Sequence, residues 1–103
     1  MGVNEIRKTQ QFSYWFDSLA DIKARARIMV RIDRLAAGNP GDTKSLGCGI
    51  SELRIPYGPG YRVYYTIRAR TVIILLAGGD KSSQSRDITL AKELAKNLKD
   101  LPL

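Results

Sequence analysis

Apolar residues recur at helical spacing in a stretch near the start of the chain. Thr9 precedes this stretch as a suitable N-cap, because its hydroxyl oxygen can accept a hydrogen bond from an N–H group of the first helical turn. The spacing matches the buried stripe of an amphipathic helix, so core packing explains these mostly aromatic side chains better than base stacking does. The members of the stripe are Phe12, Trp15, Phe16 and Leu19.

A second amphipathic helix is predicted from Ile22 to Ala37, with Asp21 as its N-cap and the segment 38–40 as its end. A solvated face is the simpler explanation for its cations. Such a face normally mixes signs, however, and Asp33 is the only acid in the body of this helix. The cations are therefore a candidate surface for phosphates or for an acidic partner. The apolar stripe is Ala24, Ile28, Ile32 and Leu35, and the opposite side carries Lys23, Arg27, Arg31 and Arg34.

Short strand patterns dominate the second half of the chain. Segments 50–55, 61–68 and 71–77 are rich in β-branched and aromatic residues. The turns between them are too short for parallel pairing, which predicts antiparallel neighbours. The third segment is apolar throughout and is expected to be an interior strand covered on both faces. Val3 to Arg7 gives a weaker strand signal.

Two breaks frame these strands. Residues 38–49 form a Gly-, Pro- and polar-rich segment that contains Lys44 and is expected to be a loop. Residues 78–81 are expected to end the last strand, and a final helix is predicted from Ser83 or Gln84 to Leu98. The resulting order is β-α-α-β-β-β-α. It describes an α+β fold in one domain, residues 1–103, with an antiparallel sheet packed against helices.

Composition adds a strong positive charge. The 103 residues include 17 Lys or Arg and 10 Asp or Glu, a net charge of +7, which favours polyanionic partners. The longest apolar run, residues 72–77, is too short to cross a bilayer, so no membrane role is expected. The chain has no signal-peptide pattern, and its one cysteine, Cys48, cannot form an internal disulfide. We therefore expect a cytoplasmic protein.

The absence of histidine limits the chemistry that this chain can perform. It excludes Ser-His-Asp triads, Cys-His pairs and most zinc sites, and the scattered acids predict neither a metal nor another cofactor. Metal-free RNA cleavage needs an activated 2′-OH, a stabilised phosphorane and a protonated 5′-oxygen. Arginine can stabilise the phosphorane, while Lys, Tyr or a carboxylate can act as acid or base.

Strand alternation predicts where suitable cations meet. Glu52 and Arg54 are expected to face outward on segment 50–55, on the same surface as Arg62 of the next segment. Lys81 is expected to reach the edge of this surface, and Tyr57 to add an aromatic ring. The combination suits a phosphate and an unstacked base, although ordinary surface cations beside a packing tyrosine explain it equally well. The outward set of segment 61–68 is Arg62, Tyr64, Thr66 and Arg68.

Two segments carry a family resemblance. Residues 52–65 read Glu-Leu-Arg-Ile-Pro-Tyr-Gly-Pro-Gly-Tyr-Arg-Val-Tyr-Tyr, and residues 75–84 read Leu-Leu-Ala-Gly-Gly-Asp-Lys-Ser-Ser-Gln. Together they resemble the RelE/ParE superfamily of bacterial toxins, specifically its HigB-like, phage-derived addiction module killer proteins. Residues 31–35, 38–44 and 87–88 fit the same proteins, so the resemblance covers nearly the whole chain.

The resemblance implies a RelE-like fold and the toxin of a type II toxin–antitoxin system. The resemblance to RelE-like members further implies a ribosome-dependent, metal-independent mRNA endonuclease that inhibits translation. Its implied partners are the ribosome with mRNA and a cognate antitoxin, usually a helix-turn-helix, HigA-like protein. The family pattern places Arg62 on the scissile phosphate, with Arg54 on the preceding strand and Lys81 after the last strand.

The sequence departs from this family pattern in two places. Glu52 replaces one of the two lysines of the preceding strand, and the catalytic tyrosine has no clear counterpart in residues 84–87. The substitutes that we consider for the acid and base are Tyr57, Tyr64, Asp80 and Gln84. The residues expected to bind RNA are Lys44, Tyr64, Arg68, Arg27, Arg31 and Arg34.

Two other functions fit the same residues. A ParE-like toxin inhibits DNA gyrase by protein contact, and the same fold serves it without a nuclease site. A basic domain can also bind RNA or the ribosome without cutting. The sequence leaves these alternatives open beside the endonuclease.

Overall fold

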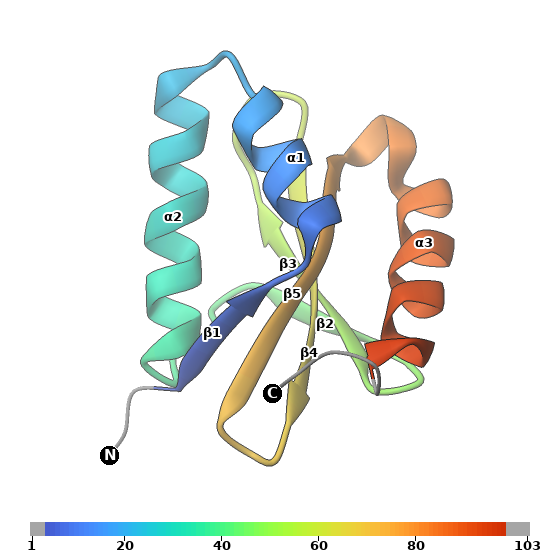
Figure 1. The fold of residues 1–103 in the computed structure, drawn as a ribbon. Coiled ribbons are helices and arrows are strands. Elements are labelled where there is room, and N and C mark those ends of the chain that lie inside the picture. Colours follow the sequence, from blue (N-terminus) through green and yellow to red (C-terminus); the bar gives the residue numbers. More distant parts are fainter. Residues whose placement is uncertain (1–3, 99–103) are drawn as a thin grey trace.

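A five-stranded mixed sheet organises the chain in the computed structural model, which describes residues 4–98 (Figure 1). The order across the sheet is β1-β5-β4-β3-β2, with β1 parallel to β5 and the other neighbours antiparallel. The short connections from β2 to β5 account for the antiparallel pairs. The strands are β1 (Glu5–Lys8), β2 (Thr43–Gly47), β3 (Ile50–Ile55), β4 (Tyr61–Arg68) and β5 (Val72–Asp80).

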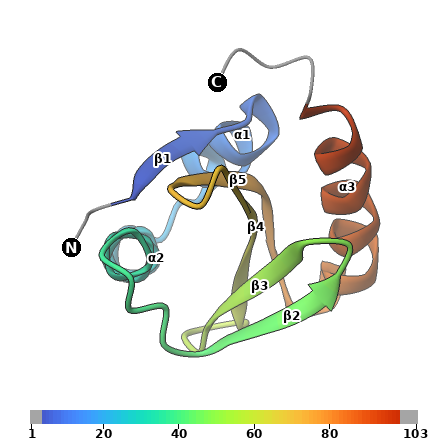
Figure 2. The same ribbon diagram turned by 90° about the horizontal axis from the view of Figure 1, so that it is seen from below.

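Helices cover both faces of the sheet (Figure 2). α1 (Gln10–Ser18) and α2 (Ile22–Ala36) pack on one face, and α3 (Gln84–Lys96) packs on the other after the short 3-10 turn η1 (Lys81–Ser83). Both predicted N-caps are confirmed. Thr9 Oγ1 accepts a hydrogen bond from the backbone of Phe12 at 3.0 Å, and Asp21 Oδ1 accepts from Lys23 and Ala24 at 3.0 and 3.1 Å.

Each face of the sheet has its own hydrophobic core. Residues 73–77 of β5 are all buried, which confirms the prediction of an interior strand covered on both faces. The core on the side of α1 and α2 includes Phe12, Ile28, Leu53, Val63 and Leu75. The core on the α3 side includes Ile50, Tyr64, Leu76, Ala91 and Leu98.

The structure confirms the α+β class and the predicted bounds of β3 and β4, but it contains one strand more than expected. Residues 43–47, predicted as part of a loop, form β2 and pair antiparallel with β3. This edge strand has no buried residue and hence no apolar alternation that sequence patterns detect. β1 is parallel to β5, so the sheet is mixed rather than purely antiparallel. Val3, placed in the first predicted strand, lies outside the described residues.

The predicted break at Gly78 and Gly79 is also wrong, because β5 continues through both glycines to Asp80. Their role is close packing. A Cβ atom at Gly78 would lie 2.2 Å from a ring carbon of Trp15, and one at Gly79 would lie 1.8 Å from Oδ2 of Asp87. The two glycines therefore let α1 and the start of α3 approach opposite faces of the strand.

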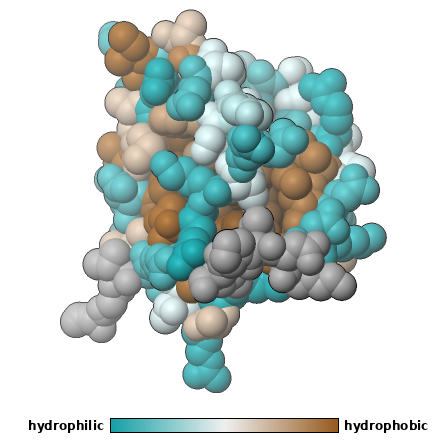
Figure 3. All heavy atoms as spheres, in the orientation of Figure 1, coloured by the Kyte–Doolittle hydropathy of each residue, from teal (hydrophilic) through white to brown (hydrophobic). Residues whose placement is uncertain are grey.

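The outer surface mixes hydrophilic and apolar residues, as the face in Figure 3 shows. The large apolar side chains that remain exposed include Ile22 and Val30 on α2 and Ile67 on β4. No helix among residues 4–98 is both long enough and apolar enough to cross a membrane.

Candidate functional site

Three neighbouring strands bring the two predicted arginines together on the α3 face of the sheet. In the strand register Arg54 is directly opposite Arg62, and Arg62 is directly opposite Gly79. Directly opposed residues of antiparallel strands point to the same face. The expectation that Arg54 and Arg62 share a surface is therefore confirmed. We call these two residues the arginine row.

Glu52 lies beside the arginine row and is only 1% exposed. Its Oε1 accepts a hydrogen bond from Nε2 of Gln84 at 2.8 Å and lies 3.7 Å from Nε of Arg62, while Oε2 lies 3.9 Å from Nε of Arg54. The prediction that Glu52 faces outward is wrong, because α3 covers this part of β3 and Gln84 contacts the carboxylate. Glu52 is a buried counter-ion of both arginines.

The two guanidinium groups differ in exposure and in their other partners. The Arg62 side chain is 13% exposed; its Nη1 donates to the carbonyl of Gly60 at 2.8 Å, and its Nε is buried without a hydrogen-bond partner. The Arg54 side chain is 39% exposed, with Nη2 and Nε at 3.0 and 3.2 Å from Oδ1 of Asp42. Asp42 therefore partly neutralises Arg54. The alternation of side chains along the predicted strands did not identify Asp42 as a neighbour of this site. The β2–β3 pairing is what brings it there.

Two lysines flank the arginine row with exposed side chains. Lys81 opens η1, and its backbone N–H donates to the carbonyl of Pro59 at 3.4 Å, which holds η1 against the turn between β3 and β4. Lys44 is directly opposite Glu52 in the register of β2 and β3, so both side chains lie on the same face. The arginines and lysines thus belong to one end of the α3 face.

Tyr64 is fully buried and makes no hydrogen bond through its hydroxyl. Desolvation raises the pKa of this hydroxyl well above its ordinary value, and the negative charges of Glu52 and Asp87 add to the effect. The prediction that Tyr64 binds RNA is wrong, because the ring packs in the core between the sheet and α3. Burial and the raised pKa also exclude it as an accessible base.

Asp80 and Gln84 are the remaining acid or base candidates near the row. The hydroxyl of Ser82 donates to Asp80 at 2.5 Å and, with backbone N–H groups, holds the pKa of this carboxyl below its ordinary value; the charge of Arg62 acts in the same direction. Asp80 is therefore ionised at neutral pH and offers no proton. Gln84 has no titratable proton, and its amide binds Glu52.

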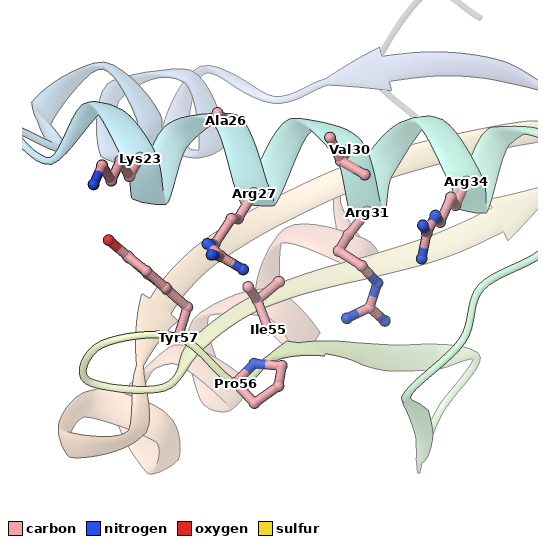
Figure 4. Close-up of a pocket in the computed structure, with 9 residues that line it drawn as sticks. All are labelled: Lys23, Ala26, Arg27, Val30, Arg31, Arg34, Ile55, Pro56 and Tyr57. Carbon is pink, nitrogen blue, oxygen red and sulfur yellow. The ribbon is translucent and has the colours of Figure 1, made fainter.

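Tyr57 lies on the other side of the sheet, facing α2 (Figure 4). Its ring centroid is 4.6 Å from the guanidinium carbon of Arg27, and its hydroxyl donates to Asp21 at 3.4 Å. The prediction that Tyr57 adds its ring to Arg54 and Arg62 is wrong. Tyr57 follows Ile55 by two residues and continues onto the face where Ile55 packs in the core beneath α2.

A groove of about 500 Å³ separates α2 from residues 55–57, and we call it the α2 groove. Arg27 and Arg34 are exposed at its border. Arg31 is engaged structurally: Nη1 donates to the carbonyl of Arg54 at 2.5 Å, and Nη2 donates to the carbonyls of Pro40 and Asp42 at 2.9 and 3.2 Å. Among residues 4–98, the side chains that line the groove include four cations and no acid. Its lining is Lys23, Ala26, Arg27, Val30, Arg31, Arg34, Ile55, Pro56 and Tyr57.

Arg68 lies away from the arginine row. It ends β4, six residues after Arg62, which is about 20 Å along an extended strand. Its Nη2 donates to the carbonyl of Ala95 in the last turn of α3 at 3.3 Å. Among residues 4–98, no group of three or more His, Cys, Asp or Glu side chains is placed to hold a metal ion.

Comparisons with known proteins give relatives of the sequence and of the fold. Residues 14–99 match the family described as Phage derived protein Gp49-like. An uncharacterized protein of Haemophilus influenzae is 49% identical over 94 residues, which are 91% of this chain and 95% of the relative. A double mutant of the E. coli toxin RelE, solved in the free state, has a TM-score of 0.67 at 15% identity and covers 93% of this chain and 98% of that chain. The expected RelE-like fold is thereby confirmed.

Proposed function

The chain belongs to the phage-derived Gp49-like family, and we propose that it is the toxin of a type II toxin–antitoxin pair, a ribosome-dependent mRNA endonuclease that needs no metal. One observation carries the proposal. Arg54 and Arg62 lie directly opposite each other on a RelE-like sheet, with the exposed Lys81 beside them. The resemblance of residues 52–65 and 75–84 to RelE-type toxins supplies the substrate, mRNA on the ribosome, and hence a place of action in the cytoplasm.

RNA cleavage by the 2′-OH develops negative charge on the scissile phosphate. The guanidinium of Arg62 donates a hydrogen bond to the Gly60 carbonyl, which restricts its position. A preorganised cation stabilises such charge better than a mobile one does. Arg54 and Lys81 add positive charge around it. In this proposal the exposed Lys81 is the candidate proton donor beside the row, and no base is assigned.

The experiment is translation of a defined mRNA with purified protein, followed by primer extension to map new 5′ ends with and without ribosomes. Cleavage is expected only with ribosomes. The sharpest variant is Arg62→Lys, which keeps a positive charge beside Glu52 but loses the planar guanidinium. We expect it to cut about a hundredfold more slowly, since one stabilising donor of a transition-state charge has this order of effect.

The matched control is Arg70→Lys in the turn between β4 and β5, at the other end of the sheet from Arg62. It makes the same chemical change on an exposed residue and is expected to leave cleavage unchanged. Equal loss in both variants, or no loss in either, contradicts the placement of the site at Arg62.

The α2 groove supports the second part of the proposal, the antitoxin. Its four cations and its apolar lining residues Val30, Ile55 and Pro56 suit an acidic segment that also buries apolar side chains. Charge reversal at an exposed border residue, Arg27→Glu, is expected to weaken antitoxin binding while mRNA cleavage persists. Calorimetric titration of the toxin with the antitoxin encoded beside it measures this.

The same groove favours one alternative function, a ParE-like inhibitor that binds DNA gyrase. A groove partly lined by apolar side chains suits a protein partner, and it lies on the face opposite the arginine row. A supercoiling assay with purified gyrase separates the two functions. Blocked supercoiling alongside intact mRNA would replace the endonuclease proposal with this one.

A further inference from the structure

The arginine row places two like charges directly opposite each other on adjacent strands. Such pairs repel, because their Cβ atoms are only about 5 Å apart. Arg54 and Arg62 nevertheless occupy this position, and the acid that lies between their Nε atoms is Glu52, at 3.9 and 3.7 Å. A negative charge at this point allows both guanidinium groups to stay on one face.

The burial of Glu52 is unusual for a surface counter-ion. A carboxylate that is 1% exposed loses nearly all of its hydration and is retained only when paired and hydrogen bonded. The pairing is provided by the two arginines and the hydrogen bond by the amide of Gln84 at 2.8 Å. Gln84 is the first residue of α3, so this contact also ties α3 to β3 beneath the arginine row.

The arrangement limits the directions in which Arg62 can point. Its Nη1 is held by the Gly60 carbonyl at 2.8 Å, and its buried Nε faces the Glu52 carboxylate. Within residues 4–98, Nη2 has no hydrogen-bond partner and remains available to an anion. One hydrogen bond at Nη1 and one ion-pair contact at Nε therefore restrict the orientation of this guanidinium between encounters with substrate.

We propose that Glu52 is a positioning residue, which orients Arg62 toward the scissile phosphate from beneath the site and is itself held by Gln84. This inference rests on the proposed endonuclease function and deepens it. Gln84 then acts through Glu52 and takes no part in proton transfer. Glu52, which replaces a lysine of the family pattern, thus orients the residue that contacts the phosphate in this proposal.

The test compares Glu52→Gln, Glu52→Asp and the control Glu93→Gln, which removes the same charge from an exposed residue of α3. Single-turnover cleavage on programmed ribosomes and ribosome affinity are measured separately. Glu52→Gln is expected to slow cleavage by about tenfold to a hundredfold while affinity changes little, because orientation is lost and net attraction is not. Glu52→Asp is expected to restore part of the rate. Wild-type rates in Glu52→Gln overturn the proposal.

A second readout does not depend on activity. The Nε–H signal of Arg62 in proton–nitrogen NMR spectra, assigned by its loss in Arg62→Lys, reports exchange of this proton with water. Exchange is expected to accelerate in Glu52→Gln and to stay slow in Glu93→Gln. If the wild-type protein cuts no mRNA, the proposed function fails, and this measurement still decides whether Glu52 orients Arg62. Unchanged exchange in a folded Glu52→Gln protein overturns the inference.

Discussion

Removal of the Tyr64 hydroxyl is expected to make the protein more stable. The ring of Tyr64 is fully buried in the core between the sheet and α3, and its hydroxyl has no hydrogen-bond partner. Its neighbours include the acids Glu52 and Asp87, which oppose ionisation of the phenol. Tyr64→Phe keeps the ring in the core and removes only the unpaired polar group.

The size of the effect follows from the missing hydrogen bond. A buried polar group left unpaired costs about 1–3 kcal/mol of folding free energy. We take the lower end of this range, because the atoms around the removed hydroxyl are expected to move little. Tyr64→Phe is therefore expected to raise the free energy of unfolding by about 1 kcal/mol. For a domain of this size that gain raises Tm by about 4–8 °C.

Urea unfolding of purified protein, followed by circular dichroism, measures the difference. Tyr65→Phe is the matched control, because Tyr65 is also buried but its hydroxyl lies 2.8 Å from Oγ1 of Thr43. Loss of that hydrogen bond is expected to cost about 0.5–1.5 kcal/mol, the opposite sign from Tyr64→Phe. The two variants remove the same atom from adjacent residues, so hydrophobic transfer alone cannot explain opposite signs.

The stability of Tyr64→Phe and of the wild-type protein is also compared at alkaline pH. Because the pKa of Tyr64 is raised in the folded protein, an unfolded chain loses this proton first as pH rises above about 10. The unfolded state then binds fewer protons than the folded state, and stability falls with rising pH. Tyr64→Phe is expected to remove the Tyr64 share of this fall. A loss of stability in Tyr64→Phe at neutral pH would refute the reasoning, since it would mean that the hydroxyl is hydrogen bonded.

Two further substitutions test the fold around the site by the same urea assay. Gly79→Ala is expected to destabilise by about 1–3 kcal/mol, because the added Cβ would meet Oδ2 of Asp87 at 1.8 Å and push the start of α3 off β5; unchanged stability would contradict the close packing of α3. Asp21→Ala is expected to cost about 1 kcal/mol through loss of the α2 N-cap, with Asp21→Asn retaining most of the stability; equal losses in both variants would indicate that charge rather than capping is responsible.

Periodic patterns predicted the long elements of the fold well. α2 shows four turns of consistent apolar spacing and has a capping aspartate. β3 and β4 are runs rich in β-branched and aromatic residues that are bounded by turn residues. These signals are local, so they survive without knowledge of the neighbours. β2 was not predicted because an edge strand with no buried residue is specified by its backbone pairing with β3, which is a non-local property.

The roles of Gly78 and Gly79 were also mispredicted, because they depend on non-local contacts. Gly78 and Gly79 read as a break because glycine commonly ends strands. Here they are strand residues, and their missing side chains make room for Trp15 and Asp87. Which role a glycine has depends on what packs against it, and those residues come from α1 and from α3.

The candidate site was predicted in part, because the alternation of side chains along a strand can be read from the sequence. Strand parity correctly put Arg54 and Arg62 on one face, since parity depends on sequence spacing alone. Parity does not say whether a helix covers that face. α3 packs against it, and so Glu52 and Tyr64, both predicted to be accessible, are buried beneath the helix. The same parity places Tyr57 with Ile55 on the α2 face, away from the cations that it was expected to join.

The two faces of β3 separate the two interactions of the proposed toxin. Side chains of the arginine row point toward α3, whereas Ile55 and Tyr57 line the α2 groove on the other side of the sheet. A partner seated in the groove is therefore separated from Arg62 by the sheet itself. Arg31 is the physical link, because it lines the groove and donates to the carbonyls of Arg54 and Asp42. An antitoxin in the α2 groove must therefore either extend around the turn between β3 and β4 or act through Arg31 to control the arginine row.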